Sequence, residues 1–403
     1  LALLPLSMFL GPLPTDIALS SIGLLFLAKS HRDQHWSWLR QSWLQWFGML
    51  WLLLMLRSLF TDFPQESFVK SLIFSRYLLF SASLQVWLMG KPTARKFLFW
   101  GMAVAASLAM MDTLIQYVWG HDLLGRAKWS ADRLTGPLRR PRVGWTLAWI
   151  GIPVATYGLH CLMLSENKGW QRLCWLGFVL GVFAIGLLSG DRGGLLEMLL
   201  AFSAFCVFWR PLRKRLCWVV LGAALLGGGV LWSDPAALHR QVALTVQKIS
   251  HFHDSDYGVV YRGGWQTFLD YPVFGVGVRQ YRLVCPKNHR FVVETDSEHP
   301  ISYTIDQAFP CGHHPHNIYL EWLAEAGLVG FMLFMAGLGV ALSKGWRSRA
   351  ILLADPWLLG CAMVLMARLM PRSLAISMAR STASLCPLIT TCPSALSFAA
   401  VQT

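Results

Sequence analysis

The sequence predicts an all-α integral membrane protein, with about ten to twelve transmembrane helices and one large helical periplasmic loop. Of its 403 residues, 55% are hydrophobic and only 14% are charged, whereas soluble domains carry about 25% charged residues. Its apolar runs repeatedly approach the ~20 residues that an α-helix needs to cross a bilayer. The 20 tryptophans agree with this class, because indole rings anchor at the membrane–water interface.

The apolar runs divide the chain into four parts. Residues 1–232 are expected to form an N-terminal transmembrane bundle, 233–316 a large periplasmic loop or cap, and 317–371 the C-terminal transmembrane helices. Residues 372–403 form an atypical Ser-, Ala- and Pro-rich tail, for which disorder and a frameshifted last helix are the two interpretations. The individual spans are expected at residues 1–11 (short), 14–29, 43–60, 68–89, 97–119, 143–165, 172–189, 194–209, 216–232, 317–343 and 351–370.

The net charge of +14 follows from basic loops between these spans. Cytoplasmic loops of membrane proteins are enriched in Lys and Arg, and such loops also contact anionic lipid headgroups. We therefore interpret the charge as a topology signal and not as a nucleic-acid surface. The loops expected in the cytoplasm are 29–40, 91–96, 168–172, 210–215 and 344–349, and those expected outside are 61–67, 120–142, 190–193 and 233–316.

One loop expected outside carries an unusual positive charge. Two interpretations remain open: the topology tolerates these charges locally, or they form a basic surface that attracts the anionic head of a glycolipid. The basic residues of this loop are Arg126, Lys128, Arg133, Arg139, Arg140 and Arg142.

Three further arginines lie inside or at the edge of apolar runs. Arg192 stands in "LLSGDRGGLLEMLL", where it either pairs with Asp191 or binds an anion beside the amides of Gly193 and Gly194. Arg262, next to Tyr261, is either an interfacial residue or a second phosphate ligand, since guanidinium matches phosphate oxygens in bidentate geometry. Arg76 lies within an apolar span, where it either snorkels to the interface or serves function.

The histidines of "CGHHPHNIYLEWLAEAGLVG" are the densest polar signal in the chain. The spacing of His313, His314 and His316 fits no standard zinc motif, so we expect no metal. A solvated cluster remains one interpretation. The other is a general base, because the imidazole pKa lies near neutral, at the start of an amphipathic helix that Asn317 could cap.

Two cysteines, Cys285 and Cys311, lie in the large loop expected outside. In the oxidising periplasm they would form a disulfide that closes a loop of about 25 residues; two free thiols are the alternative. Five other cysteines lie in apolar spans and are interpreted as small buried hydrophobes, namely Cys161, Cys174, Cys206, Cys217 and Cys361.

Four motifs at these separations resemble the O-antigen ligase and polymerase superfamily of bacterial membrane glycosyltransferases. The resemblance covers roughly residues 130–345 and is carried by "RLTGPLRRPRVGWTLA", "GDRGG", "YRGGWQTFLDYPVFGVG" and "HPHNIYLEWLAEAGLVG". It departs from the family at Asp191, where the family usually has Ser.

The resemblance implies a lipid-linked donor, undecaprenyl pyrophosphate bearing a polysaccharide. It implies transfer at the periplasmic face of the inner membrane to a sugar hydroxyl, which for a ligase belongs to the lipid A-core, with no metal or other cofactor. Alternatives are an O-antigen polymerase, a protein O-oligosaccharyltransferase and, from another class, a transporter of anionic lipids.

The resemblance also implies residue roles. Arg192, Arg262 and, more loosely, Arg76 would bind the donor pyrophosphate, and His316 would be the base that deprotonates the acceptor hydroxyl. The supporting residues would be His314, Asn317, Tyr261 and Gly193.

Overall fold

The computed structural model describes residues 1–164, 169–213, 222, 225, 227–229, 231–252, 255–288 and 314–370. The described part is helical, and its only β-pairing consists of two isolated bridges. The N-terminal helical elements are α1 (Leu4–Leu10), α2 (Pro12–Arg32), η1 (Ser37–Arg40), α3 (Ser42–Ser58), α4 (Pro64–Ser83), η2 (Leu84–Leu88) and α5 (Pro92–Trp119). They are followed by α6 (Val143–Thr146), η3 (Leu147–Gly151), α7 (Ile152–Leu164), α8 (Gly169–Leu188), α9 (Arg192–Phe208) and α10 (Arg210–Arg213). The remainder comprises α12 (Pro235–Leu238), η4 (His239–Ala243), α13 (Leu244–Ser250), α14 (Asp256–Asp270), α15 (Tyr281–Asn288), α16 (Ile318–Arg347), α17 (Arg349–Ala354) and α18 (Pro356–Leu369).

Six of the described helical segments are long and apolar enough to cross a membrane. The predicted class, an all-α integral membrane protein, is therefore confirmed, while the total of ten to twelve crossings stays a prediction. The short apolar run at 1–11 does not form a crossing by itself, because the 7 residues of α1 reach only about 10 Å. Residues 216–232 are described only in part, and the predicted tail 372–403 lies outside the described residues.

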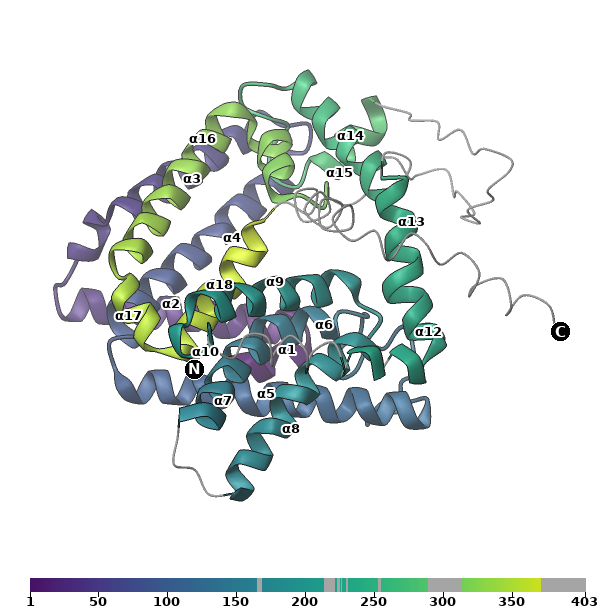
Figure 1. Ribbon diagram of the computed structural model, residues 1–403. Coiled ribbons are helices and arrows are strands. Elements are labelled where there is room, and N and C mark those ends of the chain that lie inside the picture. The colour runs from purple at the N-terminus through teal and green to yellow at the C-terminus, as the bar shows by residue number, and fades with distance from the viewer. Residues whose placement is uncertain are drawn as a thin grey trace, which may run out of the picture.

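The helices form two groups that lie one above the other in Figure 1. In the upper group α3 packs against α4 and α16, and α2 packs against α4. In the lower group α18 packs against α7 and α9, and α7 packs against α8. Helix α1 contacts both α2 and α5 and so links the two groups at the N-terminal end.

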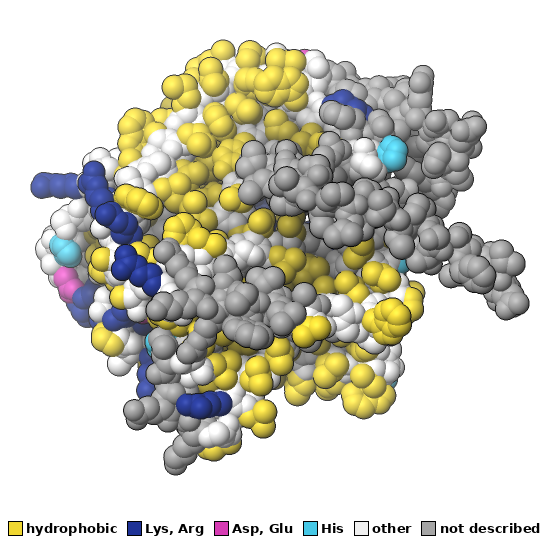
Figure 2. All heavy atoms as spheres, in the orientation of Figure 1, with side chains coloured by type: hydrophobic (Ala, Val, Ile, Leu, Met, Phe, Trp, Pro, Cys, Tyr) yellow, Lys and Arg dark blue, Asp and Glu magenta, His cyan; other side chains and the backbone are white. Residues whose placement is uncertain are grey.

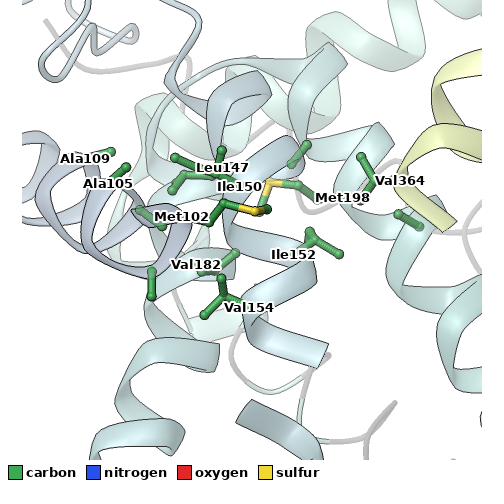
Figure 3. Packing of buried hydrophobic residues seen from close by; sticks show 14 of the residues in the cluster. Met102, Ala105, Ala109, Leu147, Ile150, Ile152, Val154, Val182, Met198 and Val364 are labelled. Atoms are coloured by element: carbon green, nitrogen blue, oxygen red, sulfur yellow. The ribbon is translucent and has the colours of Figure 1, made fainter. Parts of the chain in front are cut away.

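The lower group contains the largest hydrophobic core (Figure 3). Small residues of α5, among them Ala105 and Ala109, let its backbone approach the turn that carries Leu147. Helices in lipid commonly pack by close approach through small residues, because lipid tails are themselves apolar and the hydrophobic effect does not drive helices together. This core fixes α6 against α9, the helix that begins at Arg192.

The outer surfaces of the helices are apolar. Figure 2 shows hydrophobic side chains over much of the visible face, with Lys and Arg gathered along one edge. Leu24, Leu56 and Phe97 are each more than half exposed. Apolar patches of this extent on a soluble protein would promote aggregation, so the surface agrees with a lipid environment.

A helical arm made of α12, η4 and α13 runs from the lower group to α14 (Figure 1). It is attached at its base to the connection between α8 and α9. The Gln241 side-chain amide donates to the Leu187 carbonyl at 2.8 Å, and Arg240 Nε donates to the Gly190 carbonyl at 2.8 Å. The arm therefore places α14 relative to the start of α9.

Helix α16 is interrupted at Gly327, which has a φ of 64° and a ψ of −169°. The interruption exposes backbone groups, and the loop after α14 pairs with them. The amide of Val276 donates to the Ala324 carbonyl at 2.9 Å, and the amide of Leu328 donates to the Pro272 carbonyl at 2.8 Å. The continuous apolar span predicted at 317–343 is thus two helical pieces, and the first, 318–326, carries the histidine turn at its start.

Candidate active site

The basic loop 120–142 is held in place by polar side chains of α5. The carboxamide oxygen of Gln116 accepts the amides of Thr135 and Gly136, and its nitrogen donates to the Thr135 hydroxyl at 2.9 Å. Asp112 accepts the amide of Leu123 at 2.7 Å. Because Gln116 is fully buried, these bonds fix the loop as a built element at the end of α5.

Asp191 organises the start of α9. Its carboxylate accepts the Gly194 amide at 3.2 Å as the N-cap of the helix, and also accepts the Trp145 amide at 3.0 Å. Gly194 packs directly on the backbone of Gly144, where no Cβ would fit. The Gly194 amide is therefore occupied by Asp191, which differs from the exposed amide that the sequence suggested.

Three arginines converge beside this helix start. Arg240 pairs with Asp132 at 2.8 Å, and the amide of Leu134 donates to the Ser189 carbonyl at 3.1 Å. These contacts set Arg133 close enough to Arg192 and Arg240 for electrostatic interaction with both. The structure thus joins the predicted Arg192 to a residue of the basic loop and to Arg240, which no sequence pattern marked.

The charges of this cluster perturb each other. Burial lowers the pKa of the Arg133 guanidinium, the charges of Arg240 and Arg192 lower it further, and the Asp191 and Asp132 carboxylates oppose them. For Asp132, burial alone would raise the pKa, but hydrogen bonds from the Ser130 hydroxyl and from Arg240 outweigh burial and hold it below its ordinary value. The Asp132 carboxylate therefore stays ionised and keeps Arg240 in place.

The predicted base, His316, lies on a tight turn immediately before α16. Its φ of 53° is in the left-handed region, which is uncommon for a residue other than Gly. Its amide donates to His314 Nδ1 at 3.2 Å, and the two imidazole rings lie 4.2 Å apart. Asn317 caps α16 by accepting the Tyr319 amide at 3.0 Å, as the sequence predicted. The imidazole of His316 is exposed, so a hydroxyl group can reach it.

Helix α14 supports this turn through one face. Tyr257 and Gly264 are seven residues apart and so lie on the same side of the helix. The Tyr257 ring lies 5.7 Å from the His316 ring, and a Cβ on Gly264 would lie 3.0 Å from Pro315 Cβ. The sequence pointed to Tyr261, which instead packs edge-on against Phe252 at 5.6 Å.

Arg262 lies on a different side of α14, where it is exposed. It is two residues from Gly264, and residues so spaced on a helix do not face the same way. Arg262 therefore lies on the helix that supports the histidine turn, but not on the face of that helix that packs against the turn.

Arg76 forms an ion pair of 2.8 Å with Asp16 of α2, and it donates to the Tyr77 hydroxyl at 2.9 Å. A charge at this depth needs such a partner. Its known contacts thus lie within the upper group, apart from the other predicted ligands.

Cys285 is disulfide-bonded and is buried against Tyr281 and Val284. The predicted partner Cys311 lies outside the described residues, as does His313, so the pairing of these two cysteines stays a prediction. Cysteines outside disulfide bonds occur among the described apolar helices at Cys161, Cys174, Cys206 and Cys361, while Cys217 lies outside the described residues. Cys174 is exposed, whereas the sequence suggested burial.

A charged cluster that the sequence did not indicate lies one to two turns along α9. Glu197, 6% exposed, accepts the Trp149 indole N–H at 3.0 Å and pairs with Arg368 of α18 at 3.4 Å. The Arg368 guanidinium lies 3.7 Å from the centre of the Trp145 ring. An acidic residue within an apolar run was the available signal, but its partner is 171 residues away.

Comparison with known families bears on this arrangement. Residues 176–335 match the family model described as O-antigen ligase. This match, which covers less than half of the chain, supports a relationship to the O-antigen ligase and polymerase superfamily. The match contains Arg192, Arg262 and the histidine turn, whereas Arg76 and the basic loop lie outside it. No curated protein matches the chain. Together with the six apolar helices, the match supports a membrane protein with a function of the O-antigen ligase or polymerase type.

Two of the motifs noted in the sequence meet at the break in α16. The "DYPVFGVG" and "AEAGLVG" motifs are the two partners of the backbone pairing at the interruption of α16. Their glycines have positive φ values of 66° at Gly275 and 64° at Gly327. These motifs therefore position the histidine turn, while Arg192, Arg262 and His316 supply the polar side chains of the candidate site.

Proposed function

We propose that this protein is an O-antigen ligase that moves a polysaccharide from undecaprenyl pyrophosphate to a sugar hydroxyl of the lipid A-core. The family match over residues 176–335, which holds two arginines and the histidine turn, is the observation that carries the proposal. The reaction would take place at the periplasmic face of the inner membrane.

In the proposed reaction His316 accepts the proton of the acceptor hydroxyl. The hydroxyl oxygen forms a bond to the anomeric carbon of the donor glycan, and the bond from that carbon to the pyrophosphate oxygen breaks. The leaving undecaprenyl pyrophosphate takes the electron pair, and the proton on His316 passes to water. A single displacement of this kind inverts the anomeric centre, so a product with the donor configuration would contradict it.

The arginines contribute electrostatic stabilisation. Charge on the pyrophosphate grows as the glycosidic bond breaks, and fixed guanidinium groups at a partly dehydrated rim stabilise that charge. Losing one such donor commonly lowers the rate by about 10²–10³. Arg192 is the first residue of α9 and Arg262 lies on α14, so two different elements would contact the donor.

The test is glycan transfer in membranes that contain the lipid-linked donor and the lipid A-core acceptor, read as laddering on a gel. We expect His316→Ala to abolish laddering while the protein still inserts. The matched control is His251→Ala, since His251 is also exposed, at the end of the helical arm, and its imidazole lies 3.0 Å from the Ser250 hydroxyl. If the wild-type chain lengthens the donor polymer without loading the acceptor, the polymerase activity replaces the ligase activity.

A further inference from the structure

The basic loop supplies a group that the predicted pyrophosphate ligands do not include. Arg133 is half-buried, and its Nε is a buried donor without a hydrogen-bond partner among the described residues. Within the described residues its side chain donates from the other end of the guanidinium to the Pro141 carbonyl, over a long distance of 3.5 Å. A buried donor left in this state costs free energy unless a ligand satisfies it.

The neighbours of Arg133 leave the cluster with a net positive charge. The Asp132 and Asp191 carboxylates favour the charged form of Arg133, whereas the charges of Arg240 and Arg192 disfavour it. Three guanidinium groups therefore share two carboxylates, of which Asp132 is paired with Arg240 at 2.8 Å and Asp191 also accepts the amides of Gly194 and Trp145. Like charges gathered at one place repel, and an anion between them would relieve the repulsion.

The geometry of the loop holds Arg133 in this position. The carbonyl of Asp132 lies directly against the α-carbon of Gly190, where no side chain would fit, and Arg240 bridges Gly190 and Asp132. The residues on both sides of Arg133 are thus fixed to the connection that begins α9. A preformed cation of this kind binds an anion without a further cost of ordering the side chain.

We propose that Arg133, together with Arg192, binds the phosphate groups of the lipid-linked donor, and that the Asp132–Arg240 pair positions it. The ligand class is a diphosphate, bare or as an ester. Guanidinium is suited to this class because its planar fork matches two phosphate oxygens and keeps its charge. The inference deepens the proposed function and rests on it for the identity of the anion.

The experiment measures binding to the purified full chain in a neutral detergent, with inorganic pyrophosphate and with undecaprenyl pyrophosphate as separate probes. We expect Arg133→Gln to weaken binding of the lipid-linked diphosphate at least tenfold. Arg139→Gln is the matched control, because it removes the same charge from an exposed position of the same loop, and it should change the affinity less than twofold. Binding of both probes would assign the site to the diphosphate alone, and binding of the lipid form only would add the isoprenoid chain to what is recognised.

A second measurement separates ligand binding from folding. Without ligand, Arg133→Gln should melt at the same temperature as the wild type or higher, because it removes a repelled charge, whereas a structural arginine would lower the melting temperature. Arg133→Lys retains the positive charge but not the planar guanidinium, so its affinity for the lipid-linked diphosphate should lie between those of the wild type and Arg133→Gln. The double variant Arg133→Gln, Arg192→Gln should lose less than the sum of the single losses if both residues hold one anion.

The proposal fails if Arg133→Gln and Arg139→Gln bind both probes equally, or if the wild type binds neither. These outcomes are independent of the glycan-transfer assay with His316→Ala. Transfer without a role for Arg133 would leave the ligase proposal standing, and diphosphate binding without transfer would leave the Arg133 site standing.

Discussion

The charges of arginines near the membrane surface are stabilised by different partners in this chain. Arg76 has a carboxylate partner in Asp16, and Arg368 has one in Glu197 together with an aromatic ring. Arg133 instead shares the carboxylates of Asp132 and Asp191 with two other arginines. At the residue scale, this difference separates cations that hold helices together from a cation whose surroundings fit an anion.

The structural role of Asp191 can be tested by substitution, because its carboxylate joins α9 to α6. Asp191→Ala removes the helix cap, which costs ~1 kcal/mol, and leaves the Gly194 and Trp145 amides without an acceptor. Asp191→Ser restores one acceptor and should recover part of the loss. We expect the melting temperature to fall in the order wild type, Asp191→Ser, Asp191→Ala, measured in detergent. An alanine variant as stable as the wild type would contradict the structural role of the carboxylate.

At the element scale, glycines decide where the helices of the site can meet. Gly194 brings α9 onto α6, and Gly264 brings α14 onto the histidine turn. Gly327 adopts backbone angles that are essentially confined to glycine, and so allows α16 to break and pair with the loop after α14. The position of His316 follows from these close approaches more than from contacts of its own side chain.

Gly264→Ala should therefore impair catalysis without unfolding the protein. The added Cβ would lie 3.0 Å from Pro315 Cβ, so the turn must move by a few tenths of an ångström, and small misplacements of a catalytic group are costly. We expect the rate of glycan transfer to fall about tenfold, with a melting temperature within a few degrees of the wild type. The control is Gly339→Ala in α16, where an added Cβ would meet open space. It should leave the transfer rate and the melting temperature unchanged, and equal effects from the two variants would contradict this account.

The sequence predicted most of these elements because burial in lipid leaves a simple apolar signal. Described helices overlap ten of the eleven predicted apolar spans, and Asn317 caps α16 as expected. The break at Gly327 was missed because apolar residues continue from Leu328 onward and a single glycine in an apolar run does not by itself predict a break. The turn at 315–316 and its support by Tyr257 were missed for another reason: both depend on a loop and a helix that pack only in the folded chain.

At the scale of the whole molecule, the parts of the site that escaped prediction are pairings between distant segments. Asp132 and Arg240 are 108 residues apart, and Glu197 and Arg368 are 171 apart. Neither pair leaves a local pattern, since each member is an ordinary charged residue in its own segment. The chain therefore indicates which residue types can bind a pyrophosphate, while the packing of α9, α18 and the arm determines which of them stand together.

The orientation of the whole molecule is the remaining prediction, and it decides whether the site can meet its donor. Most loops rich in Lys and Arg remain in the cytoplasm, which places Arg347 at the end of α16 inside. The alternation of the predicted spans then places the basic loop with Arg139 outside, against its own charge. In a background with the exposed Cys174 replaced by Ser, we expect Arg139→Cys to react with a membrane-impermeant maleimide in cells whose inner membrane is intact. Arg347→Cys should react only after that membrane is permeabilised. The opposite pattern would place His316 and the arginine cluster in the cytoplasm, where a ligase acting on periplasmic lipid A-core could not work.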